Sequence, residues 1–125
     1  MAAPKGVAVL GSTGSIGTTA LRVLDRQRER FRVTALTANS NAALLKEQAL
    51  KFSPSFVGMV ESQDGSDASW ESGTDALVTA ATRSDVDIVL NAIVGAAGLD
   101  ATLAALEGGK RVALANKETL VIAGD

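Results

Sequence analysis

A glycine-rich turn near the start of the chain has residue types and spacing that could bind a phosphate. It reads Gly11-Ser-Thr-Gly14-Ser-Ile-Gly17 and lies between a short apolar stretch and an amphipathic one. Gly11 lets the chain turn sharply, Gly14 leaves room for a phosphate near the backbone, and Gly17 allows close packing of a helix on a sheet. Backbone N–H groups and the helix dipole favour an anion there, and Thr13 and Ser15 add hydroxyl donors. The turn therefore predicts binding of a dinucleotide pyrophosphate.

The spacing of these glycines leaves a structural alternative open. The motif is G-x-x-G-x-x-G, one residue longer than the usual dinucleotide fingerprint, and no P-loop lysine follows it. A tight turn that serves only packing would use the same glycines. Its position after a strand and at the start of an amphipathic helix favours the dinucleotide site.

The segment after the second expected strand indicates which dinucleotide binds. Enzymes that use NAD usually carry an acidic residue there, which holds the ribose 2′-hydroxyl. This chain has Asn39-Ser40-Asn41 at that point, with no carboxylate to repel a 2′-phosphate. Ser40 and Asn41 can donate to an anion, or one of them only caps the following helix. The segment favours NADP over NAD, although it contains no Lys or Arg.

Two further segments follow later strands. Residues 91–98 are mostly small, so they leave room for a nucleotide, or else Asn91 satisfies the local backbone. Residues 116–119 are polar, and polar groups at a strand end are costly to bury unless they pair or bind something. Lys117 could hold a phosphorylated or carbonyl substrate. The alternative is a helix start, where Glu118 would be favourable.

Alternating strands and helices must position these segments. Strands are predicted at 6–10, 31–38, 56–60, 86–93 and 111–115, and helices at 15–28, 41–51, 76–82 and 99–106. The buried face of the first helix is expected to contain Ile16, Ala20, Leu21, Val23 and Leu24. The pattern predicts an α/β fold, namely a doubly wound, Rossmann-like parallel sheet of strand order 3-2-1-4-5 in a single three-layer αβα domain.

Residues 61–75 interrupt this alternation and are predicted to form a solvated surface loop. They include five acidic residues, four serines and two glycines. Trp70 lies within them and is expected to cover a sheet edge or a partner surface.

Composition excludes several kinds of function. The chain has 125 residues, a formal net charge of −2 and neither His nor Cys. Histidine-based triads, cysteine nucleophiles, disulfides and zinc clusters are therefore excluded within it. A pI near 5.1 argues against nucleic-acid binding. The charge-free apolar run at 88–99 is shorter than the ~20 residues that cross a bilayer. Without a signal-peptide pattern, we expect a cytoplasmic protein with no membrane partner.

Three motifs together resemble one enzyme family. GSTGSIG at 11–17, NAIVGAAGL at 91–99 and LANKETLV at 114–121 resemble 1-deoxy-D-xylulose 5-phosphate reductoisomerase, and FRVTALTANSN at 31–41 fits the same pattern. The resemblance implies an oxidoreductase of isoprene biosynthesis by the non-mevalonate pathway. Such enzymes convert 1-deoxy-D-xylulose 5-phosphate to 2-C-methyl-D-erythritol 4-phosphate by a skeletal rearrangement and a hydride reduction. They use NADPH and Mg or Mn, and the full-length enzymes are homodimers.

The resemblance also implies roles for individual residues. The pyrophosphate of NADPH would be held by Thr13, Gly14, Ser15 and Ile16. The 2′-phosphate would face Asn39, Ser40 and Asn41, where some members have Gly-Lys in place of Asn39-Ser40. The nicotinamide side of the cofactor would be contacted by Asn116 and Glu118, and the substrate by Lys117.

The family's metal ligands and C-terminal helical domain have no counterpart in this sequence. We therefore expect residues 1–125 to be an NADPH-binding domain, truncated before the catalytic, metal-binding and C-terminal helical domains. Such a chain holds no complete catalytic set and no metal site, so it should bind cofactor without turnover. Residues 121–125 are expected to continue a helix. The alternatives are the N-terminal half of another NADP-dependent reductase, of the semialdehyde dehydrogenase type, or a non-enzymatic nucleotide-sensing module.

Overall fold

Strands and helices alternate along the computed structural model, which describes residues 3–61, 66–93, 95–115 and 120–123. The strands are β1 (Lys5–Leu10), β2 (Phe31–Ala38), β3 (Phe56–Met59), β4 (Glu71–Ser72), β5 (Ile88–Asn91), β6 (Arg111–Ala115) and β7 (Leu120–Ala123). The helices are α1 (Ser15–Arg26), α2 (Ala42–Phe52), α3 (Asp75–Thr82) and α4 (Ala96–Glu107).

All seven strands form one sheet in the order β4-β3-β2-β1-β5-β6-β7. Every neighbouring pair is parallel except β6 and β7. The five strands predicted from the apolar pattern correspond to β1, β2, β3, β5 and β6. They stand in the predicted 3-2-1-4-5 order, so the Rossmann-like fold class is confirmed.

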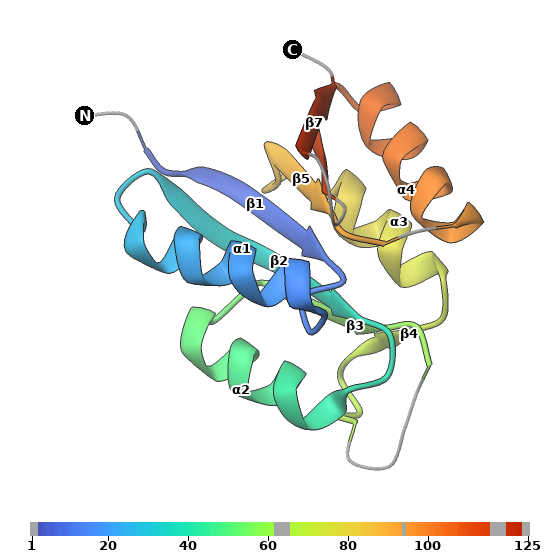
Figure 1. Cartoon of the computed structure of the whole chain (residues 1–125). Coiled ribbons are helices and arrows are strands. Elements are labelled where there is room, and N and C mark those ends of the chain that lie inside the picture. Colours follow the sequence, from blue (N-terminus) through green and yellow to red (C-terminus); the bar gives the residue numbers. More distant parts are fainter. Residues whose placement is uncertain (1–2, 62–65, 94, 116–119, 124–125) are drawn as a thin grey trace.

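Helices cover both faces of the sheet (Figure 1). Leu21 of α1 and Leu45 of α2 pack in one apolar cluster with Val7 and Val9 of β1. The opposite cluster joins β1 with α3 and α4 through a second set of buried residues, including Ala8, Leu10, Leu77, Ala101 and Ala105. Because successive strand residues point to opposite faces and β1 lies between two helical layers, the strand is apolar from Val7 to Leu10.

The first helix differs in one respect from its predicted apolar face. Gly17, Leu21 and Leu24 are buried, whereas Val23 is 53% exposed. Successive helix residues are about 100° apart, so Val23 cannot share the face that Leu21 and Leu24 turn toward the sheet. Its inclusion in the buried face was wrong.

The end of the chain also differs from expectation. Residues 120–123 form β7, which pairs antiparallel with β6 in the register Ala115↔Leu120. The helix expected through 121–125 is therefore wrong for the described residues. A β6 edge without a partner would leave a row of backbone N–H and C=O groups unpaired, and β7 satisfies them.

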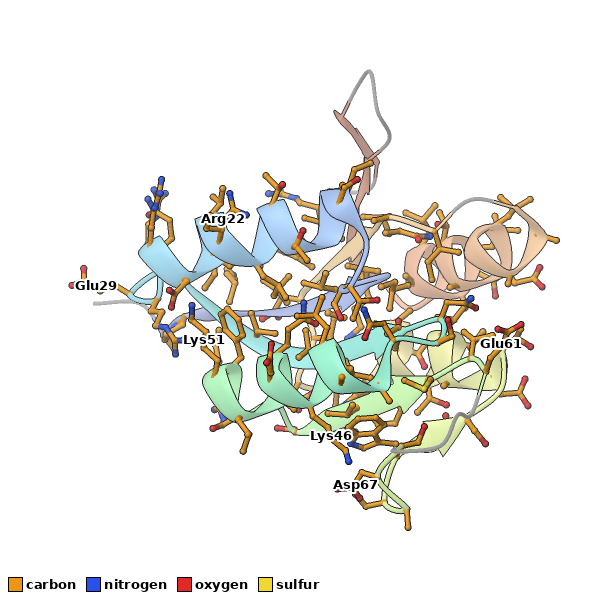
Figure 2. All side chains as sticks on the ribbon, turned by 60° about the horizontal axis from the view of Figure 1, so that its bottom comes forward. Arg22, Glu29, Lys46, Lys51, Glu61 and Asp67 are labelled. Atoms are coloured by element: carbon orange, nitrogen blue, oxygen red, sulfur yellow. The ribbon has the colours of Figure 1, made fainter. Side chains whose placement is uncertain are left out.

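Among its described residues, the acidic segment contains the short edge strand β4, which was not predicted. Trp70, just before it, packs half-buried against the apolar cluster on the α1 and α2 face of the sheet. Asp67 lies on this segment in the neighbourhood of Lys46 of α2 (Figure 2). The hydroxyl and backbone N–H of Ser69 lower the pKa of Asp67, with a smaller contribution from the charge of Lys46.

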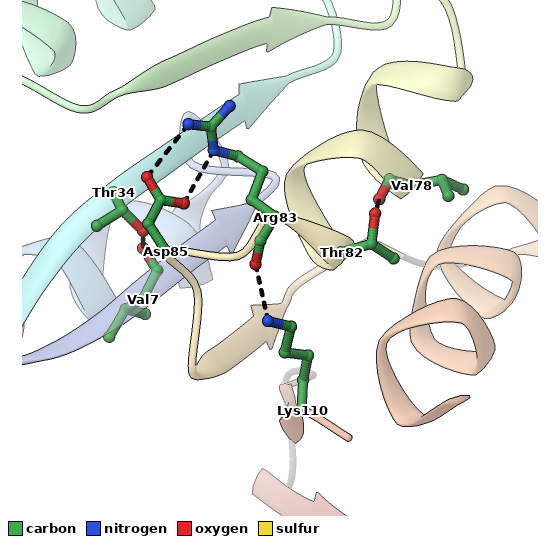
Figure 3. Close-up of polar contacts among 7 residues, drawn as sticks. All are labelled: Val7, Thr34, Val78, Thr82, Arg83, Asp85 and Lys110. Carbon is green, nitrogen blue, oxygen red and sulfur yellow. Dashed lines mark hydrogen bonds and ion pairs between the residues drawn. The ribbon is translucent and has the colours of Figure 1, made fainter. Parts of the chain in front are cut away.

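An ion pair holds the loop between α3 and β5 (Figure 3). The Arg83 guanidinium donates to both carboxylate oxygens of Asp85, at 2.9 and 3.2 Å. This contact lowers the pKa of Asp85. The Lys110 ammonium donates to the carbonyl of Arg83 at 2.7 Å, which ties the loop to the residue preceding β6. These contacts lie near the amino ends of β5 and β6. The glycine turn follows the carboxyl end of β1, at the opposite edge of the sheet.

Across the described ranges, no helix has the length and apolar character that crossing a membrane requires.

Candidate functional site

The glycine turn and the segment 39–41 come to the same edge of the sheet. β1 and β2 are adjacent parallel strands, and Leu10 pairs with Thr37 at their carboxyl ends. The backbone N–H groups of Gly11 and Ser12 both donate to the carbonyl of Thr37, at 3.0 and 2.8 Å. Ligands of doubly wound sheets bind at the carboxyl edge, so the two predicted phosphate-binding segments occupy the appropriate place.

Two of the three glycines are required by the chain's own packing. Gly11 has φ +82°, a conformation that L side chains rarely adopt. A Cβ on Gly17 would lie 2.1 Å from the carbonyl oxygen of Gly11 and 2.7 Å from the Cα of Ser12. The sharp turn at Gly11 and the close helix packing at Gly17 are therefore confirmed.

Gly14 is different, because no described residue fills the space where its side chain would be. A Cβ there would meet only the Gly11 carbonyl oxygen, at an ordinary 3.7 Å. Gly14 has φ −76° and ψ 175°, which any residue can adopt. It is exposed and caps α1 without a side-chain hydrogen bond. This open backbone at a helix N-terminus fits an approaching phosphate.

The electrostatics of both helix starts also suit an anion. Neither α1 nor α2 has an acidic residue in its first turn, so no carboxylate competes for the positive end of the helix dipole. Around Gly14, Ser15 is exposed, whereas Thr13 and Ile16 are half-buried. The predicted pyrophosphate residues thus form one continuous, partly open segment.

The segment 39–41 is held by local hydrogen bonds and by one to a residue distant along the chain. Asn41 is the N-cap of α2, and its side chain accepts from the N–H of Leu44 at 3.2 Å. Asn39 accepts from the backbone N–H of Glu61 at 2.7 Å through its carbonyl. The capping alternative for Asn41 is confirmed. The exposed side chains of Asn39 and Asn41 and the half-buried Ser40 stand at the site edge.

A buried polar pair behind the turn was not recognised in the sequence. The Ser12 hydroxyl donates to Oε1 of Gln48 at 2.7 Å, and Nε2 of Gln48 donates to the Ser12 carbonyl at 2.9 Å. Gln48 follows the apolar spacing of α2, so its pattern indicates burial but not a partner. The partner lies 36 residues away, a distance that no local pattern encodes.

Asn91 satisfies the local backbone, as the structural alternative proposed. Its amide donates to the Gly98 carbonyl at 2.8 Å and to the Thr102 hydroxyl at 2.7 Å, while its oxygen accepts from the N–H of Ile93. A Cβ on Gly98 would lie 2.4 Å from the Ile93 carbonyl oxygen. The absence of a side chain at Gly98 thus serves close packing, and α4 begins three residues earlier than predicted.

The predicted residues Asn116, Lys117 and Glu118 lie outside the described part of the chain. Within that part, no group of three or more His, Cys, Asp or Glu side chains could hold a metal ion.

The sheet order, the glycine turn and the open helix start define a class of protein, the dinucleotide-binding α/β domains. The profile of the 1-deoxy-D-xylulose 5-phosphate reductoisomerase family matches residues 7–124. The chain belongs to this family. Its membership decides against the semialdehyde dehydrogenase alternative.

Relatives and solved structures agree with this assignment. The chain is 44% identical to the reductoisomerase of Symbiobacterium thermophilum, over 97% of this chain and 35% of that protein. It is 48% identical to that of Nitrosococcus oceani, over 95% of this chain and 33% of the relative. The reductoisomerase of Zymomonas mobilis, solved in complex with NADPH, matches at a TM-score of 0.79 and 42% identity, over 92% of this chain and 32% of that one. The chain therefore spans about a third of the length of these relatives.

Proposed function

We propose that this chain is the NADPH-binding domain of a reductoisomerase that converts 1-deoxy-D-xylulose 5-phosphate to 2-C-methyl-D-erythritol 4-phosphate. The observation that carries the proposal is the unfilled backbone at Gly14, placed at the start of α1 in a chain of this family. The family resemblance extends to a solved relative bound to NADPH. Isoprene biosynthesis by the non-mevalonate route is the pathway that this activity implies.

The turn would hold the pyrophosphate of the cofactor. Backbone N–H groups at the start of α1 donate to phosphate oxygens, and the hydroxyls of Thr13 and Ser15 add two donors. Ile16 contributes its backbone N–H and keeps one side of the segment apolar. Because Gly14 has no side chain, the phosphate can lie against the backbone.

The segment after β2 would select the phosphorylated cofactor. Asn39, Ser40 and Asn41 carry no negative charge and offer neutral donors beside the start of α2. Asn41 uses its side-chain oxygen to cap the helix, and its amide nitrogen can donate to a phosphate. Selectivity for NADPH would thus rest on hydrogen bonds and the helix dipole instead of a lysine or arginine.

The reductive step requires residues from the next segment. When bound, NADPH supplies the hydride that reduces the rearranged aldehyde. Asn116 and Glu118 would orient the nicotinamide side of the cofactor, and Lys117 would bind the substrate. The described residues include no group of three or more His, Cys, Asp or Glu side chains that could hold the metal ion of the complete enzyme. A homodimeric complete enzyme and a cytoplasmic location belong to the same proposal.

Calorimetric titration with NADPH and NADH tests the cofactor assignment. We expect NADPH to bind at least about tenfold tighter, a difference of about 1.4 kcal/mol. Equal binding of both nucleotides would contradict the role given to residues 39–41. Absence of binding by either would reduce the glycine turn to a structural feature. ADP-ribose serves as a control, since a nucleotide-sensing module should bind it as tightly as NADPH.

A further inference from the structure

The reciprocal contact between Ser12 and Gln48 links the two phosphate-binding segments. Ser12 is fully buried and Gln48 is 7% exposed. The hydroxyl and carbonyl of Ser12 are both hydrogen-bonded to the side-chain amide of Gln48. The backbone N–H of Ser12 donates to the Thr37 carbonyl. Ser12 therefore belongs to the glycine turn but is committed to positioning, and it is not a donor to the cofactor.

Near this pair, a hollow lies between parts of α1 and α2. It has a volume of about 230 Å³ and is lined by residues including Leu21, Leu44, Gln48 and Phe52. The helices lie side by side on one face of the sheet (Figure 1). Apolar side chains of both helices pack in one cluster on the sheet, but they do not fill the hollow, so polar contacts beside it contribute to the spacing of the helices.

A second polar contact joins these helices at their far ends, but it is exposed. Lys51 of α2 lies 3.4 Å from Asp25 of α1, and the lysine side chain is 59% exposed. Exposed ion pairs contribute little to stability and are screened by salt. The buried Ser12–Gln48 pair is therefore the firmer restraint on α2 near the site.

Gln48 transmits this restraint to the start of α2. It lies six residues after Ala42, which is about 9 Å along a helix that rises 1.5 Å per residue. Asn41 caps the same helix, so a shift of Gln48 along or around the axis moves the segment 39–41 with it. Ser12 precedes Thr13, the first residue proposed to contact the pyrophosphate.

We infer that the Ser12–Gln48 pair positions the two phosphate-binding segments relative to each other and thereby sets the preference for NADPH over NADH. This inference rests on the proposed function. A ligand with a pyrophosphate and a 2′-phosphate needs both segments at the correct distance from each other, whereas NADH depends mainly on the glycine turn. Losing the pair should therefore weaken NADPH binding more than NADH binding, because a two-point ligand benefits only when both points are reached together.

The test compares Ser12→Ala, Gln48→Met and the double variant by calorimetry with both nucleotides. The measured quantity is the ratio of the NADH Kd to the NADPH Kd. We expect each single variant to lower this ratio about five- to tenfold, the order expected for one buried hydrogen bond. In the double variant this ratio should fall no further than in the single variant with the larger fall, since the two residues act as one unit.

Thermal melting separates positioning from simple destabilisation. Gln48→Met leaves the buried Ser12 hydroxyl without a partner, and the double variant removes that hydroxyl. The double variant should therefore have a higher melting temperature than Gln48→Met, while its ratio of NADH Kd to NADPH Kd stays low. Thr34→Val is the matched control. This substitution removes another buried hydroxyl, that of Thr34 in β2. The Thr34 hydroxyl donates to the Val7 carbonyl at 3.4 Å, away from the candidate site. Its Kd ratio should equal that of the parent chain.

The outcomes distinguish the two hypotheses. If folded variants keep the parental ratio, the positioning role is wrong while the proposed function stands. A parallel fall in the ratio of Thr34→Val would also overturn it, since the effect would then follow stability alone. If the parent chain binds neither nucleotide, the proposed function fails, and the inference fails with it.

Discussion

Gly14 and Gly17 belong to the same glycine-rich segment, but they differ in whether the fold leaves room for a side chain. A Cβ on Gly17 would collide with the backbone of Gly11 and Ser12, whereas a Cβ on Gly14 would lie at an ordinary 3.7 Å from the Gly11 carbonyl oxygen. A glycine that the fold does not need is the more informative residue about function, since its missing side chain leaves room for something outside the chain. The two positions therefore allow a matched pair of substitutions.

Gly14→Ala should leave the fold intact and weaken cofactor binding. Its backbone conformation suits alanine, so we expect a stability loss of no more than about 1 kcal/mol from the poorer N-cap. The new methyl group would occupy the phosphate position, so NADPH affinity should fall at least about tenfold, or about 1.4 kcal/mol. Calorimetry and thermal melting of the same sample measure both effects.

Gly17→Ala is the counterpart of that substitution. The Cβ of the new alanine would lie 2.1 Å from a backbone oxygen. We therefore expect the free energy of unfolding to fall by about 1–3 kcal/mol or more, as in overpacked cores. A variant that melted like the parent chain would show that α1 shifts freely, which would undermine the assignment of Gly14 as the only open position of the pair.

Asn41 combines helix capping with a proposed phosphate contact, and two substitutions separate these roles. Asn41→Ser keeps a capping oxygen, whereas Asn41→Ala removes it and should cost about 1 kcal/mol of stability. Both lose the amide nitrogen, so both should bind NADPH more weakly while NADH binding changes little. Unchanged NADPH affinity in a stable Asn41→Ser would restrict Asn41 to capping.

At the level of elements, the loop between α3 and β5 depends on a charge that titrates in acid. The Arg83 guanidinium lowers the pKa of Asp85 below its usual 3.8. The folded form therefore holds the carboxylate more strongly than the unfolded chain does. This contribution to stability is present above about pH 3.8 and is lost as the pH falls through the lowered value.

Asp85→Asn should flatten this part of the acid-stability profile. Both side chains of the pair are about one-third exposed, so the difference at pH 7 should be at most about 1 kcal/mol. Melting scans between pH 2 and pH 7 compare the variant with the parent chain. The two should converge at the acid end, and a constant difference across that range would mean that the ion pair is not its cause.

At the scale of the whole molecule, the chain spans about a third of its relatives' length and its described residues include no metal-ligand group. We therefore expect NADPH binding to be independent of divalent metal, with the same Kd in EDTA and in Mg. With 1-deoxy-D-xylulose 5-phosphate, Mn and NADPH together, absorbance at 340 nm should remain constant. Substrate-dependent decay would show that 125 residues suffice for turnover.

The local pattern determined the elements near the site well. β6 has the predicted bounds, and the five main strands follow the predicted order, because long apolar stretches bounded by glycine and polar residues specify buried parallel strands. The roles of Gly11 and Gly17 also followed from local chemistry. The motifs sufficed to indicate the family that the profile match confirmed.

Other features depended on residues that are distant along the chain. Val23 is apolar yet exposed, because the angle at which α1 meets the sheet decides which of its residues are buried. Leu120 to Ala123 form a strand because the neighbouring β6 offers unpaired backbone groups, which outweigh the local helical pattern. The Ser12–Gln48 contact exists only because β1, β2 and α2 meet at one edge.

The sequence by itself therefore determined the fold class, the glycine turn and the family, since these depend on residue type and short-range spacing. Only the tertiary structure decided which glycine could accept a side chain, which polar residues are already paired, and how the glycine turn and the segment 39–41 are joined. Those properties depend on distances between groups far apart in sequence, and folding alone brings such groups together.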